Sequence, residues 1–244
     1  MVNHLAVDAG KISYRYESGT LAIDNLSLQI KQGEKVGIIG PNGAGKSTFL
    51  TLLNGLRLPT GRLDIFGQTV SDKDNLKKIR SMVGLVFQNP DDQLFMTDVY
   101  DDLAFGPRNQ SLDEDEVQQR VDHALQTLDS TELRDRSTLQ ISFGQKKLIA
   151  IAGVLSMQPQ LIALDEPTGN LDALHRRKLI DWLNDSKQSI VITSHDLDFL
   201  WDTCSRIVLL NSGVLVVDGN LETILKDENL LKQNQLELPL RFQV

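Results

Sequence analysis

The segment Gly40–Ser47, G-P-N-G-A-G-K-S, matches the whole phosphate-binding loop pattern G-x-x-x-x-G-K-[ST]. Its glycines let the backbone curl around phosphate groups. The N–H groups of the loop and the N-terminus of the next helix then supply partial positive charge to the phosphates. Lys46 can reach the β- and γ-phosphates of a nucleotide, and the Ser47 hydroxyl can bind Mg²⁺. The sequence therefore predicts a nucleotide site formed by Gly40, Asn42, Gly43, Gly45, Lys46, Ser47 and Thr48.

Two adjacent carboxylates, Asp165 and Glu166, directly follow the apolar run Leu161–Leu164. A short apolar run this far downstream suits a central parallel strand whose carboxyl end opens onto the ligand crevice. There Asp165 would hold Mg²⁺, directly or through water, and Glu166 would orient or deprotonate an attacking water. From these two residues alone, an acidic pair that merely caps a strand-to-loop turn is an equally open interpretation.

Elements that could position these groups alternate along the chain. The buried strand Val36–Ile39 and a helix over 47–53 flank the phosphate loop. Residues 89–152 are expected to be mainly helical, because apolar residues recur at helical spacing over 117–128. Further strands are expected over 63–66, 161–165, 189–193 and 206–217, a helix over 172–184, and a short helix with a tail over 221–244. This alternation predicts a mixed α/β core with an inserted helical subdomain.

The composition narrows the class of protein. The chain has 244 residues, a normal 41% of hydrophobic residues, and a net charge of −8, which argues weakly against nucleic acid as the main partner. Its single cysteine excludes an internal disulfide. No apolar run approaches the roughly 18 residues that would cross a bilayer, and the first residues lack a signal-peptide pattern.

Further motifs, in order, resemble those of the ATP-binding cassette (ABC) ATPases. Ile141–Gln145 is similar to the family signature L-S-G-G-Q, and Gln88 follows an apolar strand as the Q-loop glutamine does. Asn170–Asp172 resembles the D-loop, His195 the switch histidine, and Tyr16 the aromatic residue that stacks on adenine. The resemblance covers residues 5–220. It is specific, because several motifs occur along the chain in the same order as in the family.

The resemblance implies an α/β fold of the P-loop NTPase class, with an antiparallel β subdomain and a helical subdomain. The ATPase domain would span 1–220, with the helical subdomain at about 89–152 and a short C-terminal tail at 221–244. ATP and Mg²⁺ are the implied cofactors, with Ser47, Gln88 and Asp165 near the metal and Glu166, His195 and Gln88 in catalysis. Without the resemblance, a lone histidine at a strand end would more often be a surface or hydrogen-bonded residue.

The signature implies a second ATPase subunit, either another copy of the chain or a paralogue. In the family, signature residues equivalent to Ser142 and Gly144 contact the γ-phosphate bound by the other subunit. Two positions depart from the family pattern: Phe143 replaces a glycine, and Leu148 replaces a basic residue. Because the Phe143 side chain is much larger than that of glycine, it could limit how closely the two subunits approach.

Three segments resemble the ATPases of energy-coupling factor (ECF) importers: Gln88–Phe95, Asp101–Pro107 and Leu148–Leu155. Those importers take up vitamins or transition-metal ions, and the general similarity is greatest to the cobalt/nickel type. The resemblance implies a membrane coupling subunit, a substrate-binding membrane subunit, and a peripheral position on the cytoplasmic face of the cell membrane. A soluble ABC ATPase, for example of the iron–sulfur assembly type, and the ATPase of another ABC importer remain open alternatives.

An acidic segment directly follows Gln88. Asp91, Asp92, Asp98, Asp101 and Asp102 lie within twelve residues that contain no lysine or arginine. By itself this would ordinarily be a solvated loop. In the family, arginine-bearing coupling helices sit beside the Q-loop, and carboxylates can bind arginine in a bidentate manner. We therefore expect the membrane partner to dock near Asp91–Asp102, against an apolar wall of Leu94, Phe95 and Met96.

Overall fold

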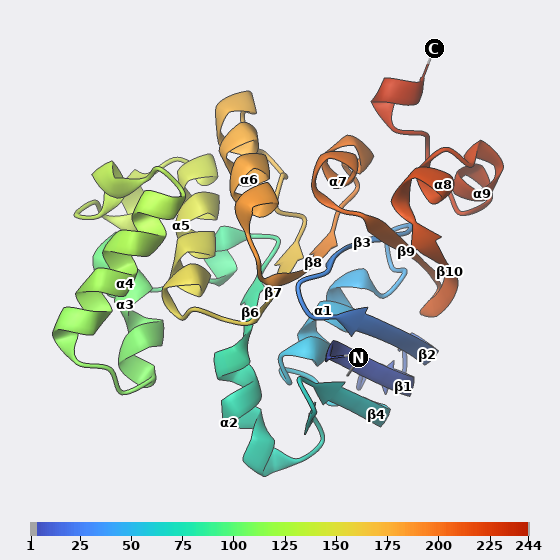
Figure 1. Cartoon of the computed structure of the whole chain (residues 1–244), viewed down its shortest axis with the longest axis horizontal. Coiled ribbons are helices and arrows are strands. Elements are labelled where there is room, and N and C mark those ends of the chain that lie inside the picture. The colour runs from blue at the N-terminus through green and yellow to red at the C-terminus, as the bar shows by residue number, and fades with distance from the viewer. Residues whose placement is uncertain (1–3, 244) are drawn as a thin grey trace.

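The computed structural model describes residues 4–243, which form two β-sheets with helices between and around them (Figure 1). The larger sheet has six strands in the order β10-β9-β3-β8-β7-β6. Neighbours from β9 to β6 are parallel, whereas β10 runs antiparallel to β9. The strands are β3 Lys35–Ile39, β6 Val83–Val86, β7 Leu161–Asp165, β8 Ser189–Thr193, β9 Arg206–Asn211 and β10 Val214–Asn220.

Hydrophobic cores cover both faces of this sheet. Successive residues of a strand point to opposite faces, so Leu161 and Ala163 join one apolar cluster while Ile162 and Leu164 join the other. All five residues of β7 and of β8 are buried. This explains why these strands read as continuous apolar runs, as parallel strands covered on both faces do.

One expected strand is instead a hairpin. The strand predicted over 206–217 is interrupted at Ser212 and Gly213, whose φ values are +50° and +80°. Two consecutive residues with positive φ make the tight turn whose twist matches antiparallel strands, and glycine favours that conformation. The chain therefore reverses, and β10 becomes the edge strand.

The smaller sheet is antiparallel, in the order β2-β1-β4-β5. Its strands are β1 Leu5–Arg15, β2 Leu21–Lys31, β4 Thr60–Ile65 and β5 Gln68–Thr69. Helix α1, Lys46–Leu53, shares one apolar cluster with strands of both sheets, and seven of its eight residues are buried. The phosphate loop that begins α1 is therefore attached to a rigid element.

Helices form a compact group on one side of the molecule (Figure 1). After α2 (Lys73–Met82) and β6 come η1 (Pro90–Asp92), α3 (Val99–Asn109), α4 (Glu114–Thr127), η2 (Thr131–Leu133), η3 (Thr138–Gln140) and α5 (Phe143–Ser156). The expected stripe over 117–128 is buried in the core. Helix α6, Ala173–Asp185, and helix α7, Leu197–Thr203, cover the same face of the large sheet as α5.

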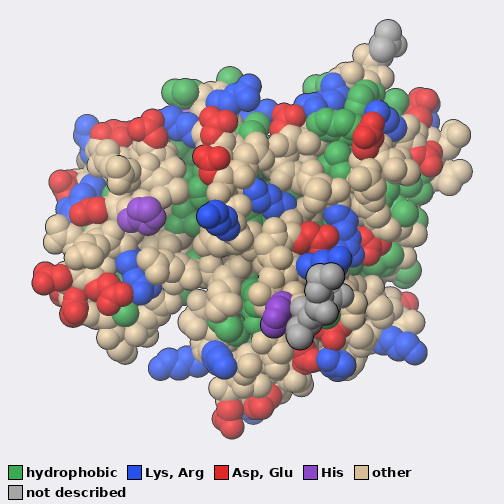
Figure 2. Space-filling view, viewed as in Figure 1, with side chains coloured by type: hydrophobic (Ala, Val, Ile, Leu, Met, Phe, Trp, Pro, Cys, Tyr) green, Lys and Arg blue, Asp and Glu red, His purple; other side chains and the backbone are tan. Residues whose placement is uncertain are grey.

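The last part of the chain is more ordered than expected. In place of one short helix and a tail, the structure has α8 (Leu221–Leu225), α9 (Glu228–Gln233) and the short turn η4 (Leu240–Phe242). Leu221, Leu225 and Leu231 are buried in the main core. The Phe242 ring meets Trp201 of α7 edge-on at 4.9 Å, and Figure 2 shows hydrophobic side chains gathered over this part of the surface.

Acidic and basic side chains are interspersed on the face seen in Figure 2. Within residues 4–243, no helix has both the length and the apolar character needed to cross a membrane.

Candidate nucleotide site

The order of the parallel strands brings the predicted catalytic residues together. The phosphate loop follows β3, His195 follows β8, Glu166 follows β7 and Gln88 follows β6, and these four strands are neighbours. Parallel strands place their carboxyl ends at the same edge of a sheet. A pocket of about 520 Å³ opens there, lined by Tyr16, Asn42, Gly43, Gly45, Lys46, Ser47, Thr48, Gln88, Glu166 and His195, together with Thr20, Leu21, Ala22 and Ala44.

Two glycines of the loop are required by close packing. A side-chain carbon on Gly40 would lie 2.0 Å from the Leu210 carbonyl oxygen, and one on Gly45 would lie 2.4 Å from that of Ala22. Their φ values of +149° and +101° are also conformations that glycine adopts most readily. Gly40 does not line the pocket, but its carbonyl accepts a 2.8 Å hydrogen bond from Lys46 Nζ.

Lys46 is buried between the loop and the predicted catalytic residues. Its Nζ also donates to the Pro41 carbonyl at 3.2 Å and lies 3.4 Å from His195 Nε2. Burial lowers the Lys46 pKa, while the charges of Glu166 and Asp165 act to raise it. A cation held in this position can bind the terminal phosphates of a nucleotide.

Asp165 lies behind the pocket rather than in its lining. It is 8% exposed, and its Oδ1 accepts a 2.6 Å hydrogen bond from the Thr193 hydroxyl. Its Oδ2 makes no hydrogen bond with the residues that the structure describes. The Ser47 hydroxyl and the Gln88 amide oxygen, together with an Asp165 carboxylate oxygen, would offer Mg²⁺ an all-oxygen donor set, which this ion prefers. Bound there, Mg²⁺ would neutralise phosphate charge.

Glu166 is held in an unusual conformation beside Asp165. Its φ is +45°, and its backbone N–H donates to the Thr193 carbonyl at 3.0 Å. Side-chain Oε2 accepts from the His195 backbone N–H at 3.1 Å, whereas the buried Oε1 has no hydrogen-bond partner among the described residues. Burial raises the Glu166 pKa. A buried carboxylate with one free oxygen facing a phosphate site can accept a proton from water.

His195 bridges the loop and the carboxylate. Its Nε2 lies 3.1 Å from Asn42 Oδ1 and 3.5 Å from Glu166 Oε1. Burial, followed by the charge of Lys46, lowers the His195 pKa and favours the neutral imidazole. With its proton on Nε2, a neutral His195 would donate to Asn42.

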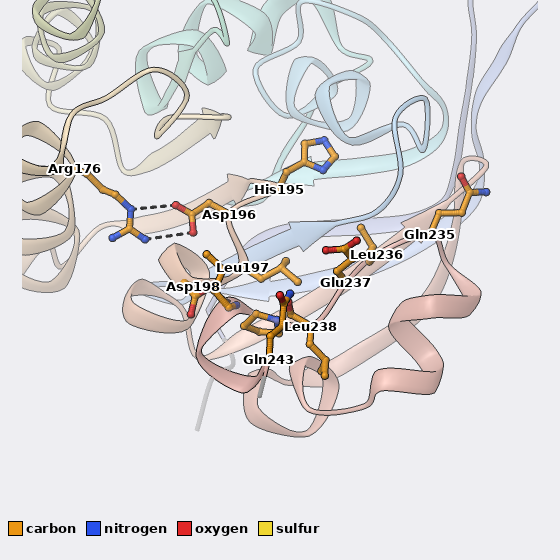
Figure 3. Close-up of a pocket in the computed structure, with 12 residues that line it drawn as sticks. Arg176, His195, Asp196, Leu197, Asp198, Gln235, Leu236, Glu237, Leu238 and Gln243 are labelled. Carbon is orange, nitrogen blue, oxygen red and sulfur yellow. Dashed lines mark hydrogen bonds and ion pairs between the residues drawn. The ribbon is translucent and has the colours of Figure 1, made fainter.

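The helix that follows His195 is anchored behind the site. Asp196 caps α7 and accepts hydrogen bonds from Arg176 of α6 at 3.1 and 3.3 Å (Figure 3). A second pocket of about 590 Å³, between α7 and residues 235–243, is also lined by His195. His195 thus lies between two cavities and is backed by a braced helix.

Tyr16 lies at the pocket as predicted, and its hydroxyl is 2.8 Å from Thr48 Oγ1. Arg57, which the sequence reasoning missed, places its guanidinium 5.1 Å from the Tyr16 ring centre without lining the pocket. Tyr14 meets the same ring edge-on. The Tyr16 ring is therefore contacted by a cation and by a second aromatic ring.

The signature residues Ser142 and Gly144 do not line the pocket of their own chain. Ser142 caps α5: its Oγ accepts from Gln145 N–H at 3.2 Å, and Gln145 Oε1 accepts from Ser142 N–H at 2.9 Å. Gly144 lies near Leu171 and His175, next to the D-loop. Phe143 remains 36% exposed, so it presents a large apolar side chain at the surface of the signature.

Comparison with known proteins places the cassette in a family. The ABC transporter family model matches residues 23–169. An energy-coupling factor transporter ATP-binding protein, EcfA of Carboxydothermus hydrogenoformans, is 42% identical over 97% of this chain and 88% of its own length. The EcfA protein of Methanothermobacter thermautotrophicus is 41% identical, with 96% and 76% covered.

Solved structures agree with this assignment. Clostridium perfringens cbiO1, described as part of the ABC transporter complex cbiONQ, superposes with a TM-score of 0.82 at 35% identity, covering 94% of each chain. A dimeric ATP-binding cassette in a post-hydrolysis state, bound to ADP and phosphate, gives a TM-score of 0.81 at 28% identity over 88% of this chain and 98% of its own. With a family match over more than half its length and relatives this similar, the chain belongs to the ABC transporter family and is an ATP-hydrolysing cassette.

Proposed function

We propose that this chain is the ATP-binding subunit of an ECF importer, and that it drives uptake of cobalt or nickel ions or of a vitamin. The observation that carries the proposal is the 42% identity, over 97% of the chain, to a protein named as an ECF transporter ATP-binding subunit. The segments Gln88–Phe95 and Asp101–Pro107, which resemble those of ECF ATPases, also support it. The subunit would lie on the cytoplasmic face of the membrane, bound to the membrane subunits.

In the proposed reaction the phosphate loop and Lys46 bind the triphosphate, and Tyr16 stacks on adenine. Glu166 orients or deprotonates the attacking water, and His195 fixes the geometry between Glu166 and the loop. Because little covalent chemistry is required of the protein in phosphoryl transfer, positioning and electrostatic stabilisation supply most of the catalysis. Ser142 and Gly144 act on nucleotide bound by a second ATPase subunit, either a copy of this chain or a paralogue.

The acidic segment offers fewer free carboxylates than the sequence suggested. Asp102 Oδ2 accepts hydrogen bonds from the backbone N–H groups of Phe95 and Met96, both at 2.8 Å, so this side chain shapes the loop. Asp91 pairs with Lys146 at 2.6 Å, and Asp101 pairs with Arg108 at 3.1 Å. These three carboxylates already have partners within the chain, and the exposed Asp98 accepts a hydrogen bond from the Thr97 hydroxyl at 3.1 Å.

Asp92 and two aromatic residues remain available for docking. Asp92 is exposed and makes no ion pair with the residues that the structure describes. Phe95 and Phe105 are 61% and 43% exposed, and their rings meet edge-on at 4.9 Å. A polar rim beside an exposed aromatic pair is typical of a protein interface. We propose that the membrane coupling subunit docks on this surface, formed by Asp92, Phe95 and Phe105.

Charge reversal tests the docking. Asp92→Lys should at least halve recovery of the membrane coupling subunit in mild detergent, because a carboxylate that pairs with an arginine becomes a repelling cation. Asp181→Lys, an equal charge change on the exposed face of α6, is the matched control and should assemble normally. Normal recovery with Asp92→Lys would exclude Asp92 from the interface. Absence of any membrane partner with the unaltered chain would overturn the ECF proposal.

The solute is tested by uptake in the source organism. Cells in which Glu166→Gln replaces the unaltered chain should lose uptake of radiolabelled cobalt or nickel ions, or of one vitamin in a panel. Loss restricted to one class identifies the substrate. Unchanged uptake of every solute in both classes would contradict the importer assignment.

A further inference from the structure

Lys147 is a fully buried cation that the established motifs do not use. Its side chain is 0% exposed, on the second turn of α5, and it makes no ion pair with the residues that the structure describes. Its Nζ instead contacts two main-chain carbonyl groups, those of Gln88 and, at 3.4 Å, of Glu166. Removing an ammonium group from water is costly unless specific partners replace the water. The burial of the Lys147 ammonium group must therefore be offset by a structural or functional role.

The two carbonyl groups belong to the two loops that carry catalytic side chains. Gln88 follows β6 and Glu166 follows β7, and these strands are parallel neighbours. Glu166 has the strained φ of +45°, which a non-glycine residue keeps only when its surroundings hold it. An ammonium group donates along several directions, so a single lysine can hold both loop backbones at once.

The acidic residues of the site also act on Lys147. Burial lowers the Lys147 pKa, while the negative charges of Asp165 and Glu166 act to raise it. Lys46 is attracted by the same two carboxylates from the phosphate-loop side. Two buried lysines, one from α1 and one from α5, are thus within electrostatic reach of the same two carboxylates.

We propose that Lys147 is a positioning residue for hydrolysis: its ammonium group, carried by α5, fixes the backbones of Gln88 and Glu166 so that their side chains meet the nucleotide correctly. The inference rests on the roles of Gln88 and Glu166 proposed above. Lys147 touches neither nucleotide nor water in this role and acts through the two loops. A purely structural lysine would instead support folding without a selective effect on turnover.

The adjacent residue provides a matched control. Lys146 is also a lysine of α5, but its Nζ pairs with the side chain of Asp91 at 2.6 Å and has no hydrogen bond to the backbone of Gln88 or Glu166 among the described residues. Lys147→Met and Lys146→Met remove the same charge from neighbouring positions, and methionine preserves most of the side-chain length. Both are compared in the full-length chain by steady-state ATP hydrolysis, equilibrium ATP binding and thermal unfolding.

We expect Lys147→Met to lower kcat at least about tenfold, since small displacements of reacting groups can cost on the order of 100-fold in rate. Its dissociation constant for ATP should change by less than about threefold, because the phosphate loop is untouched. Lys146→Met should retain the unaltered kcat. A wild-type kcat in soluble Lys147→Met, or a kcat loss matched by an equal loss of ATP binding, would overturn the positioning role.

Two additional variants keep the result decisive. If Lys147→Met does not fold, Lys147→Gln replaces it; its amide still donates but is neutral and shorter, and a wild-type kcat there would also overturn the inference. Glu166→Gln is measured in parallel. If it hydrolyses ATP normally, the proposed role of Glu166 fails and the inference fails with it. If it is inactive while Lys147→Met is normal, only the role of Lys147 is overturned.

Discussion

Replacing Glu166 by glutamine separates nucleotide binding from hydrolysis. The amide oxygen of the introduced glutamine can still accept from the His195 backbone N–H, as Glu166 Oε2 does at 3.1 Å. The buried Oε1, which has no hydrogen-bond partner among the described residues, would become an NH₂ group. Shape is preserved, but the group can no longer accept a proton from water. Binding should persist, because the phosphate loop and Lys46 are unchanged.

The expected loss follows from the role of a general base. Positioned bases contribute about 10²–10⁴-fold to rate, so Glu166→Gln should lower kcat at least about 100-fold, equivalent to about 2.7 kcal/mol of transition-state stabilisation. Removal of one negative charge beside the phosphates should leave the dissociation constant for ATP unchanged or lower it. Both quantities are measured on purified protein, by phosphate release and by equilibrium binding.

A matched substitution guards against a general effect of charge removal. Glu228→Gln alters an exposed residue of α9 that pairs with Lys232, and it should hydrolyse ATP normally. Phosphate release by Glu166→Gln within about twofold of the unaltered protein would refute the assignment of Glu166. Loss of ATP binding together with hydrolysis would also refute it, because the carboxylate would then be part of the binding site.

Two further predictions concern the C-terminal half. Arg241→Ala should lower Tm by about 2–4 °C, because the Arg241 guanidinium pairs with Asp198 and Asp202 at 2.6 and 2.8 Å. Arg108 also bridges two carboxylates but is more exposed, so Arg108→Ala should lower Tm less. Equal shifts in Tm would contradict this argument. Burial raises the pKa of Cys204 to about 12, so its thiolate at pH 8 should be on the order of 1,000-fold scarcer than in the unfolded chain. Iodoacetamide should therefore label native protein far more slowly than denatured protein, and equal rates would refute this.

The nucleotide pocket was predictable because its parts are local. The phosphate loop is a contiguous motif, and Glu166 and His195 each directly follow an apolar strand. Once those strands are parallel neighbours, their ends must meet at one edge. The sequence therefore indicated both the residues of the site and the parallel strands that bring them together, although not the order of those strands.

Features that depend on contacts between distant residues were missed. Nothing local indicates that Lys147 reaches the carbonyl groups of Gln88 and Glu166, or that Arg57 lies against Tyr16. The local signal was a lysine followed by an apolar run, within the segment expected to be mainly helical. In the same way, the acidic segment read as a set of equivalent carboxylates until the backbone partners of Asp102 were known.

Helix α5 relates the two halves of the proposed dimeric reaction. Phe143, at its first position, is partly exposed, whereas Lys147, one turn later, is fully buried. Four residues of α-helix span only about 6 Å along the axis. A second subunit that docks on the signature would therefore press on a rigid helix whose next turn contacts the backbone of Glu166 in the first subunit. Under the proposed pairing, the signature acts on the nucleotide of the second subunit, while Lys147 orders the catalytic loops of its own subunit. Because both lie on α5, they cannot move independently.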